Sequence, residues 1–136
     1  MILTSLIEVG KLSKKSTGYV AVGFALMSAL SAASLIPLAL EAGEVHSQIM
    51  WIEALGIKAG VLADPLSIIM ANVVAWISFL IMIYSTGYMK GDKDITRFWF
   101  WMMFFIGSMQ LIVLSDNLLQ VFFGWEGVGL ASYALI

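Results

Sequence analysis

The most unusual chemical group in this sequence is the carboxylate of Glu126. It lies in NLLQVFFGWEGVGLASYALI, residues 117–136, which contain no other charged side chain. Loss of hydration favours the neutral form of a carboxyl group and raises its pKa toward neutral pH. An acid in such a segment is therefore suited to binding and releasing a proton. Gly124, Gly127 and Gly129 surround it and leave room for a close helix or a bound water molecule. These residues predict a proton-carrying site.

A structural role for Glu126 is the alternative. The same acid can hydrogen-bond a neighbouring helix and hold a bundle together, and tight packing uses the same glycines. An ionisable group at mid-membrane costs about 2.5 to 3.5 kcal/mol on insertion scales. In either role we expect Glu126 to face protein or water rather than lipid.

The composition predicts an integral membrane protein. Hydrophobic residues make up 61% of the 136 residues, charged residues make up 12%, and the mean hydropathy is +0.97. The formal net charge is -2, and the longest basic cluster is KLSKK, so nucleic-acid binding is not expected. The chain has no cysteine, which excludes disulfides and thiolate-bound metals or clusters within it.

Four apolar runs predict an all-α, polytopic membrane protein that forms part of a larger helix bundle. A membrane-spanning helix needs about 20 mostly apolar residues. Within the predicted transmembrane region, 18–136, the approximate spans are 18–40, 65–84, 98–114 and 118–136. Asp64 and Pro65 suit the N-cap and first position of the second helix. Residues 1–17 are expected to form a short amphipathic helix or a disordered tail.

The basic residues predict the orientation. They gather before the first span and between the second and third, whereas the loop 41–61 has only Lys58 against three glutamates. By the positive-inside rule, the N-terminus is cytoplasmic. We expect the membrane to be a prokaryotic plasma membrane. Glu126 then lies roughly 12 Å below the outer edge of an apolar core about 30 Å thick. No other acid of the chain lies inside a predicted span.

Two polar residues share the predicted depth of Glu126. Asn72 lies about 10 to 11 Å inward along the second helix, and Ser108 lies near the same level in the third. We therefore predict a polar layer in which Asn72 and Ser108 face the bundle and hydrate or hydrogen-bond the Glu126 site. The alternative is that both residues serve ordinary helix contacts.

Other features of the sequence have simpler interpretations. Ala21, Ala25, Ala29 and Ala33 recur every four residues and predict a close helix contact. Ser115, Asp116 and Asn117 are expected to form a turn and cap the last helix, and FWFWMMFF is expected to face lipid and the interface. His46 near Glu41 and Glu44 is expected in a solvated loop rather than a metal site. We expect no cofactor, no metal and no catalytic residue in this chain.

The last helix carries a family resemblance. GWEGVGL followed by SY, together with GVLADPLSIIMANVV, YSTGYMKGD and TRFWFWM, is similar to the largest antiporter-like membrane subunit of respiratory complex I, known as chain 5 or chain L. The resemblance covers about residues 51–136 and is weaker through the first span. It implies a parent complex that couples electron transfer to proton or sodium-ion translocation, and it implies that Glu126 matches the family's essential intramembrane glutamate.

The resemblance also implies what this chain lacks. Members of the family pair the glutamate with a lysine on a later helix, have an additional helix before the first span, and line the ion path with later broken helices. None of these is found here, so the chain resembles the N-terminal portion of a longer subunit. Other membrane subunits, and further helices from the same or another chain, are its expected partners. It would be part of an NADH:quinone-type oxidoreductase without an active site of its own.

Two other functions stay open at the sequence level. The chain could be a module of a multisubunit cation/proton antiporter, which would use the same acid. It could also be a membrane scaffold or truncated remnant that contributes packing without transport.

Overall fold

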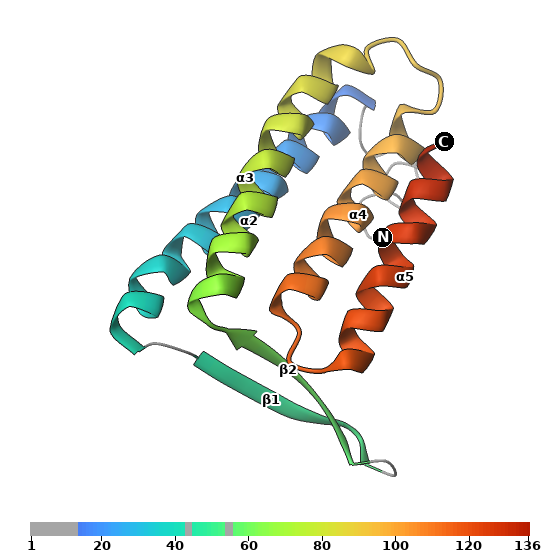
Figure 1. Ribbon diagram of the computed structural model, residues 1–136. Coiled ribbons are helices and arrows are strands. Elements are labelled where there is room, and N and C mark those ends of the chain that lie inside the picture. The colour runs from blue at the N-terminus through green and yellow to red at the C-terminus, as the bar shows by residue number, and fades with distance from the viewer. Residues whose placement is uncertain (1–13, 43–44, 54–55) are drawn as a thin grey trace.

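The computed structural model of the chain describes residues 14–42, 45–53 and 56–136. It contains four helices and one β-hairpin between the first two helices (Figure 1). The elements in chain order are α2 (Lys14–Ala42), β1 (Val45–Ile52), β2 (Ile57–Ala63), α3 (Pro65–Tyr88), α4 (Ile95–Leu114) and α5 (Leu118–Leu135). The segment 1–13, on which most of the predicted amphipathic or disordered N-terminal segment falls, lies outside the described residues.

The four helices confirm the predicted all-α membrane fold. Each is long and apolar enough to cross a membrane. They form two packed pairs, α2 with α3 and α4 with α5, and α4 also contacts α3. Successive helices run in opposite directions, so the hairpin and the α4–α5 turn lie at one end of the bundle (Figure 1). The α3–α4 connection lies at the other end.

Helix boundaries follow local capping chemistry. The N-cap of α3 is Asp64, whose Oδ1 accepts a hydrogen bond of 2.8 Å from the backbone N–H of Ser67, and Pro65 stands at the start of the helix. Both features were predicted. Helix α4 begins at Ile95, three residues before the predicted span, and α3 continues to Tyr88, four residues beyond it.

Small residues bring α2 and α3 together, as the alanine repeat predicted. Ala21, Ala25 and Ala29 are buried, and Ala29 packs with Ala32 against Ala75 of α3. Since lipid tails are as apolar as leucine, close backbone contact is what holds helices together inside a bilayer. The alanines supply that contact.

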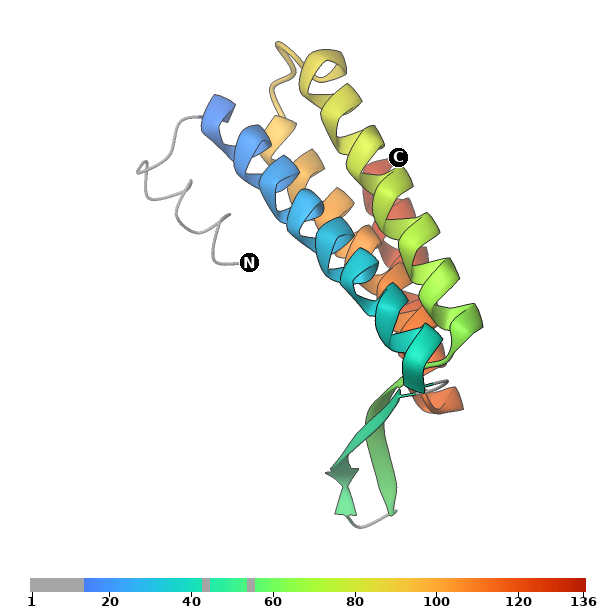
Figure 2. The same ribbon diagram turned by 90° about the vertical axis from the view of Figure 1, so that its left-hand side faces the viewer.

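The segment between α2 and α3 is an antiparallel hairpin rather than the loop expected from the sequence. Val45 pairs with Ala63 and Ile52 with Ile57, with an irregularity between Met50 and Ile52. Gly56 adopts φ 67°, a conformation that glycine reaches without the strain of a Cβ. The hairpin projects beyond the helix ends (Figure 2).

The aromatic segment at the start of α4 does not all face lipid. Trp99 is only 3% exposed and belongs to a core cluster with Ala21, Ala25, Met82 and Ile106. The expectation that FWFWMMFF serves lipid and interface contacts is therefore wrong for Trp99. The reason is Gly18 of α2, whose missing side chain leaves room for the indole ring.

Candidate functional site

Glu126 lies on a solvent-accessible face of α5. Its side chain is exposed in the isolated bundle, and so are the large apolar side chains around it on the same helix. These neighbours are Phe122, Phe123, Trp125, Leu130 and Tyr133. An apolar face this broad, with one acid in its middle, is suited to a membrane interior or to further helices rather than to water.

The opposite face of α5 is fixed to α4 through glycines. A Cβ at Gly124 would overlap Ile112, and one at Gly127 would overlap the side chain of Ser108. Both glycines are buried, as is Ala131 one turn further on. Of the two alternatives that the sequence left open, close helix packing or space for water, Gly124 and Gly127 fit close helix packing. A Cβ at Gly129 would meet no atom within 4 Å.

The carboxylate of Glu126 has no partner within the described part of the chain. No hydrogen bond or ion pair links it to any of those residues. The basic side chains whose positions are described, Lys58, Lys90, Lys93 and Arg97, lie outside the membrane-spanning helices or in the first turn of α4. The charge of Glu126 is therefore uncompensated by these residues.

Ser108 and Asn72 both lie at helix contacts, on different sides of the bundle. Ser108 is buried against Gly127, the residue after Glu126, and its hydroxyl donates to the carbonyl of Phe104 at 2.9 Å. Asn72 donates to the carbonyl of Ala32 in α2 at 2.8 Å. Ser108 thus packs on the face of α5 opposite the exposed Glu126 side chain, while the amide of Asn72 is directed toward α2.

A third polar side chain inside the membrane-spanning region was missed by the sequence reading. The Nε2 group of Gln110 in α4 donates to the carbonyl of Ala71 in α3 at 3.0 Å. The Oδ1 atom of Asn72, the next residue, is buried and has no hydrogen-bond partner among the described residues. The sequence does contain a signal for this contact, because Gln110 is an amide in the middle of an apolar span and such groups hydrogen-bond to other helices.

The hairpin is bound to the α4–α5 turn by a polar network around Asp116. Its Oδ2 accepts a hydrogen bond of 2.8 Å from Gln48 and lies 3.2 Å from Nε2 of His46. Its Oδ1 accepts from Asn117 at 2.7 Å, and its side chain is 2% exposed. Gly60 provides the space, because a Cβ there would overlap the Asp116 carboxylate. Asp116 is therefore a structural link rather than a free acid.

Asn117 and Gln120 complete this network. The Oδ1 atom of Asn117 accepts from the backbone N–H of Gln120 and caps α5, which confirms the predicted turn and cap. Its amide also donates to the carbonyl of Lys58, and Gln120 accepts from the N–H of Gly60. Both strands of the hairpin are thus hydrogen-bonded to the α4–α5 turn region.

Hydrogen bonding lowers the pKa of Asp116. Desolvation is the largest single effect and raises the pKa, but the hydrogen bonds from Gln48, Asn117 and His46 together outweigh it. Asp116 is held as a carboxylate. No cluster of three or more His, Cys, Asp or Glu suited to a metal ion is found among the described residues.

The sequence is similar to membrane subunits of complex I. Residues 50–99 match the family model described as NADH-Ubiquinone oxidoreductase (complex I), chain 5 N-terminus. NADH-quinone oxidoreductase subunit L of Rickettsia conorii is 41% identical over 92% of this chain and 20% of the relative. The subunit L of Escherichia coli is 36% identical over 93% of this chain and 22% of the relative.

A eukaryotic relative and a solved structure extend the comparison. NADH-ubiquinone oxidoreductase chain 5 of Dictyostelium citrinum is 39% identical over 93% of this chain and 20% of the relative. The structure of the Mrp complex from Dietzia sp. DQ12-45-1b contains a chain that superimposes with a TM-score of 0.65 and 28% identity, over 91% of this chain and 16% of that one.

These relatives are much longer than this chain. The chain spans about a fifth of the length of the curated relatives that it matches. The matching family model describes the N-terminus of chain 5 and covers residues 50–99, a range that ends before Glu126. The chain thus matches NADH-quinone oxidoreductase subunit L and NADH-ubiquinone oxidoreductase chain 5 along nearly all of its length, and its residues 50–99 match the family model for the N-terminus of chain 5.

Proposed function

We propose that this chain is the N-terminal portion of a proton-translocating membrane subunit in a redox-driven NADH:quinone-type complex, and that Glu126 is a proton-carrying group of that subunit. The single observation that carries the proposal is the position of Glu126. It has no partner among the described residues and lies on an apolar face of α5 that those residues leave exposed, in the middle of a helix long and apolar enough to span a membrane.

Burial cost supports this assignment. A carboxyl group facing lipid is expensive, so a face with Glu126 at its centre requires a covering that offers polar partners. The relatives have roughly five times the length of this chain, and their additional segments, or a neighbouring membrane subunit, would supply that covering. Within it, an acid without an ion pair can exchange its proton.

The similarity to the Mrp complex favours a second candidate, a module of a multisubunit cation/proton antiporter. Both functions would use the same acid. The relatives with the higher identities are complex I subunits, at 36–41% against 28% for the Mrp chain. We therefore prefer the redox-driven complex.

The orientation belongs to the same proposal. Lys90, Lys93 and Arg97 lie at the end of the bundle where α2 begins, and the hairpin with Lys58 lies at the other end. By the positive-inside rule, the first end is cytoplasmic and the hairpin is on the outer side of a prokaryotic plasma membrane. A cysteine introduced at residue 90 should react with an impermeant thiol reagent only from the cytoplasmic side.

The polar layer is the second part of the proposal. Ser108, next to Gly127, and Asn72, with its unpartnered Oδ1, would provide polar atoms at the level of Glu126. Asn72 bonds to α2, so its link to Glu126 would have to pass through Gln110 and Ser108 of α4. A distance above roughly 10 Å between Ser108 and the Glu126 side chain in the assembled subunit would remove Ser108 from this layer.

Glu126→Gln tests the proton-carrying role in the assembled complex. Glutamine preserves size and an acceptor oxygen but cannot exchange a proton. Ion pumping driven by quinone reduction in sealed vesicles should fall about tenfold or more if the proton step contributes as general acid–base groups do. The assembled complex should be present in normal amount.

The matched control is Glu53→Gln, the same chemical change at an exposed acid beyond β1. It should leave pumping unchanged. Full pumping by the Glu126→Gln complex would exclude Glu126 as a proton carrier and favour the scaffold role. Pumping lost equally in both variants would show a general effect of lost charge.

A further inference from the structure

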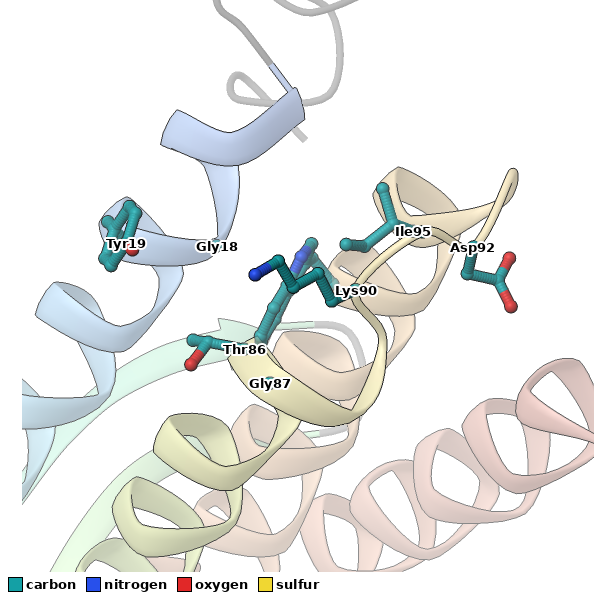
Figure 3. Close-up of a pocket in the computed structure, with 9 residues that line it drawn as sticks. Gly18, Tyr19, Thr86, Gly87, Lys90, Asp92 and Ile95 are labelled. Carbon is teal, nitrogen blue, oxygen red and sulfur yellow. The ribbon is translucent and has the colours of Figure 1, made fainter.

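A cavity of about 540 Å³ lies at the end of the bundle opposite the hairpin (Figure 3). Helix α2, the end of α3 and the start of α4 form its walls. The residues that line it include Gly18, Tyr19, Lys90, Asp92, Ile95 and Trp99.

The cavity lies at the level of a membrane surface. Three of its wall residues, Gly18, Gly87 and Ile95, stand within three residues of the ends of the segments that can cross the membrane. The side chain of Tyr19 is 73% exposed beside it, and tyrosine favours the depth of lipid headgroups. A ligand in this position would meet both headgroups and the upper part of acyl chains.

Trp99 places a hydrogen-bond donor without a partner in the cavity wall. Its Nε1 is buried and has no acceptor among the described residues. The edge of the ring that carries Nε1 lies under Gly18, where a Cβ would come within 3.0 Å of the ring. A buried donor without a hydrogen-bond partner costs about 1–3 kcal/mol, so an acceptor from outside the chain would stabilise the buried Trp99 ring.

The start of α4 adds further donors. Its N-cap residue, Asp94, makes no side-chain capping hydrogen bond, so the first N–H groups of this 20-residue helix lack that partner. Ile95, the first helical residue, is part of the cavity wall. The N-terminus of a helix attracts phosphate, because its N–H groups and dipole both favour negative charge.

The charged side chains of the wall are turned in opposite directions. Lys90 forms no ion pair within the described part of the chain, and Figure 3 shows its amino group directed toward α2. Asp92 accepts a hydrogen bond of 2.8 Å from the N–H of Asp94. In Figure 3 its carboxylate points away from Lys90 and Tyr19. The Lys90 amino group therefore faces the cavity, and the Asp92 carboxylate points away from it.

We propose that this cavity binds the phosphate of an anionic phospholipid, with Lys90, the Trp99 N–H and the start of α4 as its donors. The apolar faces of Tyr19, Ile95 and Trp99 would contact the glycerol and upper acyl carbons. The site does not depend on Glu126 or on proton translocation.

The test measures phospholipid binding to the full chain in detergent by native mass spectrometry. The probes are phosphatidylglycerol and phosphatidylcholine with identical acyl chains. We expect the protein to retain phosphatidylglycerol preferentially. Lys90→Gln should weaken this binding about fivefold, the effect of one basic residue near an anionic lipid surface. Trp99→Phe, which removes only the N–H donor and part of the ring, should also weaken it.

The matched control is Lys58→Gln, which removes the same charge at the hairpin end and should leave phosphatidylglycerol binding unchanged. Equal loss in the Lys58 and Lys90 variants, or no loss in the Lys90 variant, would overturn the proposal. Displacement of the lipid by millimolar inorganic phosphate would also overturn it, because the site would then recognise a small anion. Lys90 is exposed on the α3–α4 connection, so its variant remains informative even if Trp99→Phe does not fold.

Discussion

Asp116 and Glu126 are acids ten residues apart in the same region of the chain, and their surroundings are opposite. Asp116 is 2% exposed and accepts hydrogen bonds from Gln48 and Asn117, with His46 also in contact. Glu126 is exposed and has no partner among the described residues. One acid is satisfied by its own chain, and the other requires a partner from elsewhere.

The difference teaches how to separate structural from functional acids in a membrane protein. At the membrane surface, loop residues can surround a carboxylate with donors, which lowers its pKa and fixes its charge. Inside the span, the backbone of α5 is occupied by its own helical hydrogen bonds. A hydrogen-bond partner for the Glu126 side chain must therefore come from other side chains or from water.

The largest structural effect should come from Gly127→Leu. The new side chain would overlap Ser108 and push α5 from α4, at a cost of about 1–3 kcal/mol. This change moves Glu126 without altering its chemistry. Thermal unfolding in nanodiscs would measure the loss. Gly129→Leu is the matched control, since a Cβ there meets no atom within 4 Å; equal destabilisation by the two variants would contradict the packing assigned to Gly127.

Asp116→Ala should loosen the hairpin while leaving the membrane-spanning helices intact. It removes the carboxylate that accepts from both Gln48 of β1 and Asn117 of the α4–α5 turn, and so breaks a hydrogen-bonded link between them. Amide exchange in β1 and β2 should become severalfold faster, as hydrogen–deuterium exchange with mass spectrometry would show. Glu126→Gln should have no such effect on the hairpin, and protection unchanged by Asp116→Ala would remove Asp116 as the link.

The same link gives the hairpin a pH dependence. The pKa of Asp116 is lower in the folded protein than in the unfolded chain. Its contribution to stability is therefore complete above the unfolded pKa, about 3.9, and is lost as the pH falls through the lower folded value. Exchange in β1 and β2, measured relative to the intrinsic amide exchange rate at each pH, should accelerate below about pH 4 in the wild type. In Asp116→Asn that acceleration should be smaller, and an identical profile would contradict the assignment.

The smallest effect should come from Asn72→Leu. The change loses the hydrogen bond to Ala32, a type of contact worth about 0.6 kcal/mol inside membranes. It also removes the buried, unpartnered Oδ1, which offsets that loss. Unfolding free energy should change by less than about 1 kcal/mol. A much larger loss would mean that Asn72 has a partner beyond the described residues.

The membrane spans were predictable because hydropathy and capping are local properties. The pair Asp64–Pro65 and the residue Asn117 mark the starts of α3 and α5 in the sequence and in the structure. Ala21, Ala25 and Ala29 lie at the α2–α3 contact for the same reason, because their spacing is that of one helix face.

The hairpin and its network could not be predicted in the same way. The charges of segment 41–61 are those of a surface loop and contain no information on strand pairing. The contacts of Asp116 with His46 and Gln48 join residues 70 and 68 positions apart. The depth of a residue along a helix can be counted from the sequence. The direction in which its side chain points around the helix axis depends on how the helices pack. The burial of Trp99 and the different directions of Asn72 and Ser108 therefore required the structure.

The most direct test of the central claim is labelling with an apolar carbodiimide, which modifies protonated carboxyl groups in apolar surroundings. The assembled complex would be labelled over a range of pH and the modified peptides identified by mass spectrometry. We predict modification of Glu126 that decreases as the pH rises, and none at Asp116, which is held as a carboxylate by its hydrogen bonds. Glu126 unmodified at every pH, or equal modification of both acids, would contradict the assignment of Glu126 as the proton-exchanging group.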